Sequence, residues 1–425
     1  MRILLVNTSE KIGGAAVAAG RLRVALSTEG IKATLLVRDK QSDALTVTTF
    51  TESLVHRMRA RWAFLLERLA IFLGNGLNRQ GVFQVDIANV GLDITQLPEF
   101  KQADVIHLHW INQGMLSLGQ IKKILRSGKP VVWTMHDMWP CTAICHHAVD
   151  CTAFHQGCHD CMYLGAAKGK HDLSAQVYRR KQKCYQEGNI HFVACSEWLG
   201  NHARQSGLIT PGHVHVIPNP ISLDNFKPGD VDQIRASLHL PIDKRYILFG
   251  AVKTSDENKG VHYFIEACRL LKEMPQSQKD QWAVLVMGRG AEELLEAIPL
   301  EAYSLPFVTD SAKIVQYYQA ADLFVTPSLQ ENLPNMIMES MACGLPCVGF
   351  KVGGIPEMIR HQVTGYLAEY KDAADLASGI RYILEDTQRY RQLSHDARAF
   401  VRKHYSESVV TQQYERIYQL AIQNK

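Results

Sequence analysis

The chain has 425 residues, of which 46% are hydrophobic and 21% charged, with a formal net charge of +4. This length exceeds what one ordinary hydrophobic core organises, so we expect two domains. No run of about 18 uncharged apolar residues is present, which excludes a membrane-spanning helix, and the small positive charge argues against nucleic acid as a partner. The apolar run Arg2–Asn7 is too short for a signal peptide, so we expect a cytoplasmic protein.

Short apolar runs alternate with helical patterns through the first half of the chain. The pattern predicts a helix over Ala15–Ser27 and strands at Arg2–Asn7, Ala33–Val37, Val105–His109 and Val131–Met135. Because strands that alternate with helices form βαβ units, we expect a parallel sheet.

Six apolar residues recur at helical spacing between residues 54 and 72, and three arginines fall on a neighbouring face. The apolar residues are Leu54, Met58, Trp62, Leu65, Leu69 and Phe72, and the arginines are Arg57, Arg61 and Arg68. We favour a core helix of the first domain. The alternative is peripheral contact with an anionic membrane, which would place the protein at the inner face of the cell membrane.

The strand Val131–Met135 ends in His136 and Asp137. Ligands of open α/β sheets bind at the carboxyl ends of strands, so His136 is a candidate catalytic residue, with a packing histidine as the alternative. His107 and His109 lie along the preceding strand. We expect them to point in alternate directions, so that at most one of them faces the ligand.

A Cys-rich loop over residues 141–161 contains Cys141 and four further cysteines that are candidate metal ligands. Cys158 and Cys161 are separated by two residues, and Cys145 and Cys151 precede them. Two thiolates at short spacing can bind one ion, so the four predict a structural Zn²⁺ site. Free thiols in a flexible loop are the equal alternative.

A turn-rich stretch from Ile217 to Asp230 interrupts the pattern and is predicted as the domain linker. Asp230 and Asp232 form the chain's Asp-x-Asp sequence. We interpret them as a solvated turn and expect no cofactor or metal for catalysis. The predicted domains are 1–222, on the acceptor side, and 240–404, with a C-terminal helix over 405–425 that returns to the first domain.

The second half resumes with strands at Tyr246–Ala251, Ala283–Gly288 and Leu323–Thr326 and helices at Val261–Leu271 and Pro334–Cys343. Pro334 suits the first helical position, so the backbone around it should present N–H groups at the positive end of a helix dipole. This is a candidate anion-binding site. The donor-binding candidates here are Asn332, Leu333, Pro334 and Asn335.

Two glutamates flank this helix start. Glu331 precedes the helix and should face the group attached to the anion, whereas Glu339 lies about one turn further in. Carboxylates accept hydrogen bonds, so the pair suits a sugar and a ribose diol. The structural alternative is a cap neighbour and a solvated helix residue.

Lys253 and Lys259 lie in another loop that leaves a strand and enters a helix. Two ammonium groups neutralise a leaving diphosphate without a metal, whereas exposed lysines on a loop are the ordinary alternative. Gly13 and Gly14 form a turn between the first strand and helix, where backbone approaches a ligand closely or simply turns.

Together these parts resemble retaining glycosyltransferase family 4. The resemblance covers nearly the whole chain and is carried by Gly13-Gly14, the Lys253 to Lys259 and Glu331 to Glu339 spacings, Ile217-Pro218-Asn219-Pro220, and Gly353-Gly354-Ile355-Pro356-Glu357. It implies the α/β fold called GT-B, with two Rossmann-like domains that face a central cleft. The family often has arginine where Lys253 stands, so bidentate phosphate binding is lost there. The four-cysteine pattern resembles that of colanic-acid-type exopolysaccharide glycosyltransferases.

The resemblance also implies the site roles. Lys253 and Lys259 bind the donor diphosphate, Gly14 approaches its β-phosphate, and Asn219 joins the donor-binding residues. Glu331 faces the transferred sugar, Glu339 binds the ribose, and His136 hydrogen-bonds the sugar.

The implied function is transfer of a sugar, with retention, from a UDP- or GDP-linked donor to a glycan or lipid-linked acceptor in bacterial surface-polysaccharide biosynthesis. A nucleotide-sugar epimerase or a phosphorylase of the same fold is the alternative. The base, sugar, acceptor and oligomeric state stay open.

Overall fold

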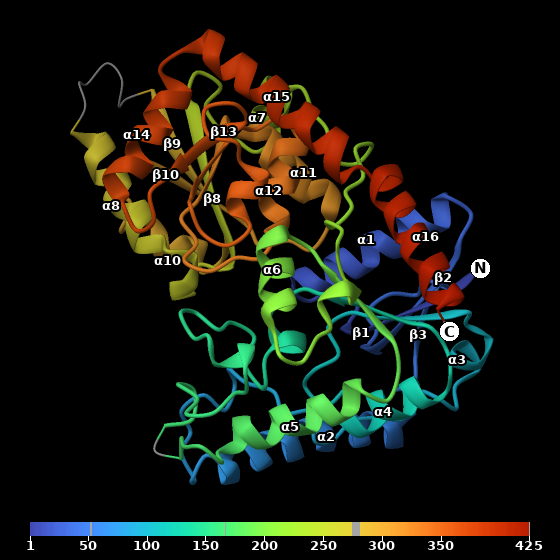
Figure 1. Cartoon of the computed structure of the whole chain (residues 1–425). Coiled ribbons are helices and arrows are strands. Elements are labelled where there is room, and N and C mark those ends of the chain that lie inside the picture. Colours follow the sequence, from blue (N-terminus) through green and yellow to red (C-terminus); the bar gives the residue numbers. More distant parts are fainter. Residues whose placement is uncertain (52, 166, 274–280, 425) are drawn as a thin grey trace. The chain divides into compact units, whose positions relative to one another are not determined.

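The computed structural model describes residues 1–51, 53–165, 167–273 and 281–424. The chain forms two compact units (Figure 1). The first unit comprises Met1–Pro220 and Val410–Lys425, and the second comprises Ile221–Val409. The chain leaves the first unit at Pro220, within the predicted linker, and returns to it at Val410. The last helix therefore belongs to the first unit.

A seven-stranded parallel sheet forms the centre of the first unit. The strands lie in the order β3-β2-β1-β4-β5-β6-β7. Their bounds are β1 (Arg2–Ser9), β2 (Lys32–Asp39), β3 (Val47–Thr49), β4 (Val105–Leu108), β5 (Val131–Met135), β6 (Ile190–Ala194) and β7 (Val214–Val216). Because the order reverses between β1 and β4, the carboxyl ends of these two strands mark the position where doubly wound sheets bind ligands.

Helices cover both faces of this sheet. They are α1 (Gly14–Thr28), α2 (Leu54–Gly74), α3 (Pro98–Gln102), α4 (Leu118–Arg126), α5 (Leu173–Tyr185), α6 (Glu197–Gln205) and α16 (Glu407–Gln423). The start of α4 illustrates how the sequence fixes such an element. The Ser117 side chain accepts from the backbone N–H of Gln120, and the Gln120 side chain accepts from that of Ser117, so two amides that lack helical partners are satisfied.

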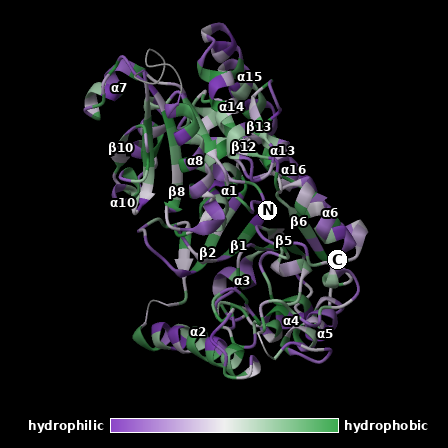
Figure 2. Ribbon diagram, turned by 90° about the vertical axis from the view of Figure 1, so that its left-hand side faces the viewer, coloured by the Kyte–Doolittle hydropathy of each residue, from purple (hydrophilic) through white to green (hydrophobic). Residues whose placement is uncertain are grey.

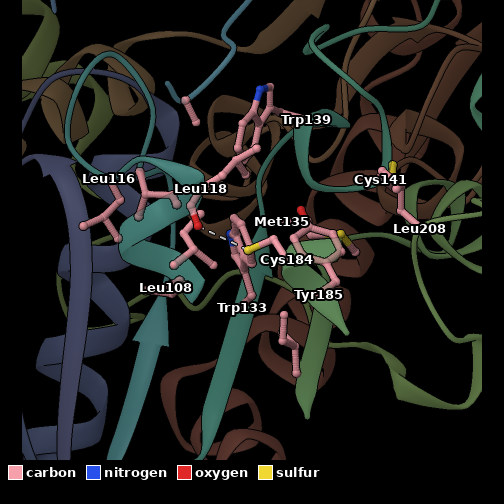
Figure 3. Close-up of a cluster of buried hydrophobic side chains, with 14 of the residues drawn as sticks. Leu108, Leu116, Leu118, Trp133, Met135, Trp139, Cys141, Cys184, Tyr185 and Leu208 are labelled. Carbon is pink, nitrogen blue, oxygen red and sulfur yellow. Dashed lines mark hydrogen bonds between the residues drawn. The ribbon is translucent and has the colours of Figure 1, made fainter. Parts of the chain in front are cut away.

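Aromatic side chains organise the core on one face of the first sheet. Trp133 of β5 packs edge to face against Tyr185 of α5, with ring centroids 5.8 Å apart, beneath leucines from β4 and α4 (Figure 3). The Cys184 thiol donates to the backbone oxygen of Leu118 at 3.4 Å, which ties α5 to α4.

The other face is closed by the C-terminal helix. In α16, Tyr414 and Tyr418 are fully buried in a cluster that includes Leu22 of α1, and α16 lies beside α1 in Figure 1. The Tyr418 hydroxyl lies 2.8 Å from Nδ1 of His107, and the Tyr414 hydroxyl lies 2.9 Å from Oγ1 of Thr134. These contacts join the end of the chain to strands β4 and β5.

The second unit repeats the topology with six parallel strands. Their order is β10-β9-β8-β11-β12-β13, which reverses between β8 and β11. The bounds are β8 (Arg245–Lys253), β9 (Trp282–Arg289), β10 (Glu301–Leu305), β11 (Leu323–Thr326), β12 (Cys347–Phe350) and β13 (Gly365–Ala368). The strands β11 and β12 are buried throughout, as covered parallel strands require.

The helices of the second unit pack on both faces of its sheet. They are α7 (Val231–Ser237), α8 (Val261–Lys272), α10 (Ala291–Leu295), α11 (Ser311–Ala320), α12 (Asn335–Ala342), α13 (Ile355–Met358), α14 (Ala373–Leu384) and α15 (Thr387–Tyr405). Their apolar residues enclose a core around Phe249, Phe264 and Phe350. The two-unit fold is the one that the resemblance implies.

Two predictions about element ends are wrong. Pro334 is the N-cap of α12 and not its first helical residue, because its ψ of 116° is extended although its φ of −68° suits a helix. Asp230 and Asp232 are exposed, as predicted, but they form the start of α7 and not a turn. There the Asp230 side chain accepts from the backbone N–H of Gln233, and Asp232 lies in the first helical turn.

The favoured core interpretation of the helix at residues 54–72 is also wrong. In α2 the buried residues are Ala60, Ala63, Glu67, Arg68 and Ile71, whereas the apolar stripe faces outward. Arg68 is buried and does not share an exposed face with Arg57 and Arg61. None of the described helices has the length and apolar character needed to cross a bilayer.

Candidate functional site

In the second unit, two loops meet where the strand order reverses. One follows β8 and the other follows β11, and a short hydrogen-bonded contact joins them: the backbone N–H of Leu329 donates to the backbone oxygen of Asn258 at 2.8 Å. Gly260 permits the approach. Its φ is +65°, and a Cβ there would lie 1.9 Å from the backbone oxygen of Pro327.

This contact places Lys259 beside Glu331. The Lys259 ammonium donates to Oε1 of Glu331 at 2.5 Å. Burial lowers the pKa of Lys259, but the charge and hydrogen bond of Glu331 more than offset this effect, so the net shift is upward. Lys259 is therefore cationic at neutral pH. Lys253 lies at the end of β8, opposite Arg289 of β9, with an exposed side chain.

A second glycine fixes the backbone of Glu331. Gly353 has a φ of +57°, and a Cβ there would lie 1.8 Å from the backbone oxygen of Glu331. The same oxygen accepts from the N–H of Gly354 at 3.3 Å. The Gly-Gly pair that the resemblance singled out without a role thus supports Glu331.

Helix α12 begins directly behind this pair. Asn332 and Leu333 are buried, Pro334 and Asn335 are half-buried, and Pro334 has no polar side chain with which to cap the helix. The first amides of a helix lack intrahelical acceptors and carry the positive end of its dipole. The start of α12 has the character that an anion site requires.

Glu339 lies in the second turn of α12 and is buried. The Tyr318 hydroxyl, from α11, donates to its Oε2 at 2.7 Å. Tyr318 was not identified from the sequence, because nothing in its local pattern marks a partner 21 residues away. This hydrogen bond fixes the position of the carboxylate. The alternative, a solvated helix residue, does not fit a side chain that is buried and hydrogen-bonded.

In the first unit, Gly13 and Gly14 lie in the loop after β1. This strand lies where the strand order of the first sheet reverses, as β8 does in the second sheet. Gly13 has a φ of +92°, and Gly14 is the first residue of α1. A Cβ at Gly13 would meet no described atom within 4 Å, so the requirement for glycine here comes from the backbone angle and not from crowding.

Three strand ends of the first unit are joined by buried side chains. Nδ1 of His109 lies 3.0 Å from Nε2 of His136, whose Nδ1 lies 3.7 Å from the Cys195 sulfur. The Cys195 thiol donates to Oδ1 of Asn219 at 3.3 Å. The structure thus brings His136 and Asn219 together through Cys195, which the sequence analysis missed.

The expectation that His107 and His109 point in alternate directions is wrong. Their ring centroids are 4.2 Å apart, because residues two apart along a strand share a face. Both rings are buried, and His107 is used by Tyr418 and by Thr134, whose hydroxyl lies 2.7 Å from its Nε2. Burial lowers the pKa of His107 to about 3.

His136 is neutral at physiological pH. Burial lowers its pKa to about 4, although the Asp137 carboxylate acts in the opposite direction. A neutral imidazole donates or accepts one hydrogen bond at each nitrogen but carries no charge.

Behind this tip lies a polar network of half-buried side chains around the buried Asp86. His146 lies between two carboxylates: its Nδ1 is 2.7 Å from Asp137 and its Nε2 is 2.7 Å from Asp86. The indole N–H of Trp110 also donates to Asp137, at 2.8 Å. Burial would lower the pKa of His146, but the two carboxylates raise it to about 10, so this imidazole is charged. The network fixes the backbone that carries His136.

The cysteine loop follows directly. Cys145 is buried, Cys158 and Cys161 are half-buried, Cys151 is exposed, and all four are free thiols. Within the described part of the chain, no group of three or more His, Cys, Asp or Glu side chains is arranged to hold a metal ion. The zinc site stays a prediction, which metal analysis of chelator-free protein would test.

Comparisons with known proteins agree with this geometry. Residues 12–225, which are 214 of the 425 residues, match the family model described as Glycosyltransferase Family 4, and residues 243–386 match the model described as Glycosyl transferases group 1. The first match covers most of the first unit, and the second lies within the second unit and includes the strands between which the strand order reverses.

Two curated relatives illustrate the similarity. The chain is 35% identical over 156 residues to the amylovoran biosynthesis glycosyltransferase AmsK of Erwinia amylovora, over 34% of this chain and 37% of AmsK. It is 30% identical over 208 residues to the N,N'-diacetylbacillosaminyl-diphospho-undecaprenol alpha-1,3-N-acetylgalactosaminyltransferase of Campylobacter jejuni, over 48% of this chain and 53% of that protein. The matches thus span about a third to a half of the relatives' length.

Solved structures share the fold over the full chain. The sucrose-phosphate synthase of Thermosynechococcus elongatus has a TM-score of 0.69 at 17% identity, over 100% of both chains. The Anabaena protein HepE, solved in complex with UDP-glucose, has a TM-score of 0.62 at 18% identity, over 99% of both chains. Together with the family model that covers more than half of its residues, this GT-B fold shows that the chain belongs to glycosyltransferase family 4.

Proposed function

We propose that the protein transfers a sugar, with retention of configuration, from a nucleoside-diphosphate sugar to a glycan or lipid-linked acceptor in bacterial surface-polysaccharide biosynthesis. The observation that carries the proposal is the ion pair of Lys259 and Glu331, which lies beside the start of α12 where the strand order of the second sheet reverses.

Departure of a diphosphate is the step that needs most electrostatic help. As the bond between the sugar carbon and the diphosphate oxygen breaks, negative charge accumulates on the diphosphate. The Lys259 ammonium and the first amides of α12 are fixed before the reaction, so they stabilise that charge without reorganising. Lys253, on the same loop, is the second candidate for this role.

The glutamates suit the hydroxyl groups of the donor. Glu331 is adjacent to Lys259 and accepts from the transferred sugar, whereas Glu339, held by Tyr318, accepts from the ribose. A bound diphosphate also replaces Glu331 as a partner of Lys259, which frees a carboxylate oxygen for the sugar.

The acceptor proton goes to the departing diphosphate. The acceptor oxygen forms its bond on the face from which the diphosphate leaves, and a diphosphate oxygen takes the hydroxyl proton. His136 hydrogen-bonds the sugar as a neutral imidazole, because a group with a pKa of about 4 is a poor base at neutral pH.

The relatives support the substrate classes. The name of the Campylobacter protein specifies a diphospho-undecaprenol acceptor, AmsK acts in amylovoran biosynthesis, and HepE was solved with UDP-glucose. HepE thus supports a uracil nucleotide as donor, and a GDP-sugar, the other donor that we propose, belongs in the same first screen.

Acceptor-dependent release of nucleoside diphosphate tests the proposal. A thermal-shift screen of UDP- and GDP-sugars first identifies the donor, because a ligand that binds the folded state raises the melting temperature. We then expect nucleoside diphosphate to appear in stoichiometric amounts with glycosylated acceptor. Release at the same rate without acceptor would contradict transfer and favour an epimerase.

A further inference from the structure

Helix α2 of the first unit differs from an ordinary surface helix in that its apolar residues face solvent and its buried face carries two charged residues. Its outward face is apolar: Trp62 is 59% exposed, and α2 lies at the margin of its unit with hydrophobic segments along its length (Figure 2). The exposed apolar residues of α2 are Leu54, Val55, Met58, Trp62, Leu65, Leu66, Leu69 and Leu73. A contiguous apolar face of this kind marks an interaction surface.

Buried polar contacts prevent α2 from turning this face inward. Arg68 forms ion pairs with Asp86 and Glu67 and donates to the backbone oxygens of Val82 and Val85. Oε1 of Glu67 accepts from two backbone amides, at 3.0 and 2.7 Å. Rotation of the helix would leave these charges buried without partners, so the apolar face stays outward.

Two further apolar side chains are exposed in the segment that follows the helix. After α2 ends at Gly74, Leu77 is 64% exposed and Phe83 is 78% exposed.

The charge on this face has one sign. The exposed charged residues of α2 are Arg57, Arg59 and Arg61, and its acidic residue, Glu67, is buried. A helix with exposed arginines and a broad apolar face is typical of helices that lie in the interface of an anionic bilayer.

A basic pocket adjoins the apolar face. It has a volume of about 670 Å³, and its lining includes Arg38 and Lys40 from the end of β2, Arg57 and Arg61 from α2, and the apolar Phe64. The acidic residue in the lining, Asp39, is already paired with Arg38 at 2.6 Å. The pocket thus has an excess of positive charge beside apolar surface, which matches a phosphate attached to an acyl chain.

We infer that α2 lies in the surface of an anionic membrane, with the apolar face among the acyl chains and a lipid phosphate in the basic pocket. The helix has 21 residues, which at 1.5 Å per residue makes it roughly 30 Å long, and it lies parallel to the membrane. A bilayer accounts for the apolar face and the arginines together, whereas a second copy of the chain would bring like charges together. The inference does not depend on the proposed function.

Vesicle flotation of the full chain tests this inference. We expect the protein to float with vesicles of phosphatidylglycerol and phosphatidylcholine at low salt, and not with pure phosphatidylcholine. Trp62 is the exposed one of the six tryptophans, so brominated acyl chains should quench part of the fluorescence, and that part should be absent in Trp62→Phe.

Two double variants separate the contributions of charge and apolar surface. Arg57→Glu/Arg61→Glu and Leu66→Ser/Leu69→Ser should each reduce vesicle binding at least about tenfold. The matched controls are Arg402→Glu/Lys403→Glu and Ile242→Ser/Val363→Ser, which make the same changes at exposed positions of the second unit and should bind like the wild type.

Three results would overturn the inference. The first is failure of the folded wild type to float with anionic vesicles, and the second is vesicle binding by both α2 variants as tight as that of their controls. Alternatively, sedimentation would show a dimer that Leu66→Ser/Leu69→Ser converts to a monomer, in which case a second copy covers the face. Should a variant misfold, quenching of Trp62 in the wild type still decides the question.

Discussion

The positions of Lys259 and Glu331 depend on two nearby glycines, which have no side chain to take part in a reaction. Gly260, after β8, and Gly353, after β12, each let their loop approach the loop after β11, because a Cβ at either position would collide with a backbone oxygen. At this scale, small residues around the ion pair matter as much as the charged groups.

Gly353→Ala should therefore impair both folding and turnover. The new Cβ would lie 1.8 Å from the backbone oxygen of Glu331, so we expect a loss of about 1–3 kcal/mol in the free energy of unfolding. Displacement of Glu331 should lower kcat/KM at least about tenfold. The measurements are urea unfolding and transfer kinetics.

Gly30→Ala is the matched control. Gly30 has a φ of +80°, but an added Cβ would meet no described atom within 4 Å. Backbone strain alone should cost roughly 1 kcal/mol and leave kcat/KM unchanged. Equal effects of the two substitutions on turnover would refute the role assigned to Gly353.

His146 should make stability depend on alkaline pH. Its pKa is raised from an ordinary 6.5 to about 10 by Asp137 and Asp86, so its charged form stabilises the folded state. That contribution is complete below pH 6.5 and disappears as the pH rises toward 10. The free energy of unfolding of His146→Gln should be lower than that of the wild type, by on the order of a few kcal/mol at low pH. This difference should become smaller as the pH approaches 10, the pKa of His146 in the folded state.

The exposed pair of His159 and Asp160 provides the comparison. His159 also lies 2.7 Å from a carboxylate but is 55% exposed, so His159→Gln should cost little at any pH. If His146→Gln lowered the free energy of unfolding by the same amount at low and at high pH, the result would contradict a charged His146 in the folded state.

At the scale of elements, α16 stabilises a sheet that is distant from it in sequence. Tyr418→Phe removes the hydroxyl that contacts His107 and should cost about 1 kcal/mol, whereas Tyr418→Ala also leaves a cavity and should cost about 3–5 kcal/mol. Gln419→Ala, next to it and exposed, should change stability by less than about 0.5 kcal/mol. Equal losses for Ala at 418 and 419 would show that α16 is not anchored by this ring.

Seven of the thirteen strands that the structure describes, and the order of the parts, could be predicted from the sequence because each is a local signal. The runs at Ile3, Val131 and Leu323 are apolar and bounded by breakers, and Lys253 and Glu331 lie in loops that follow predicted strands. Strands that carry a mixed pattern, such as β3 and β7, were missed because three residues hold too little periodicity.

Other features depend on residues far apart in the chain. The partner of Glu339 is Tyr318, and that of His136 is Cys195, 59 residues later. Which face of α2 is buried could not be predicted from the sequence either. Periodicity states which residues share a face but not what covers that face, and the buried positions of Glu67 and Arg68 depend on Asp86 and on backbone groups of a later segment.

At the scale of the whole molecule, one topology is used twice. Both sheets reverse their strand order after the first strand, and in each unit the glycine-containing loop that follows that strand leads into a helix. The unit matched to the group 1 family model carries the cation and carboxylates that suit a donor, whereas the unit matched to family 4 carries the neutral histidines and α2. The central claim is that Lys259 stabilises a departing diphosphate.

The kinetics of Lys259→Met test this claim most directly, with Lys244→Met as the control. Lys244 also pairs with a glutamate, Glu301, but precedes β8 at the opposite end of the strand from the site. We predict that Lys259→Met lowers kcat/KM for the donor by about 100-fold or more while the melting temperature stays near that of the wild type, and that Lys244→Met leaves kcat/KM unchanged. Wild-type turnover in folded Lys259→Met would contradict the account.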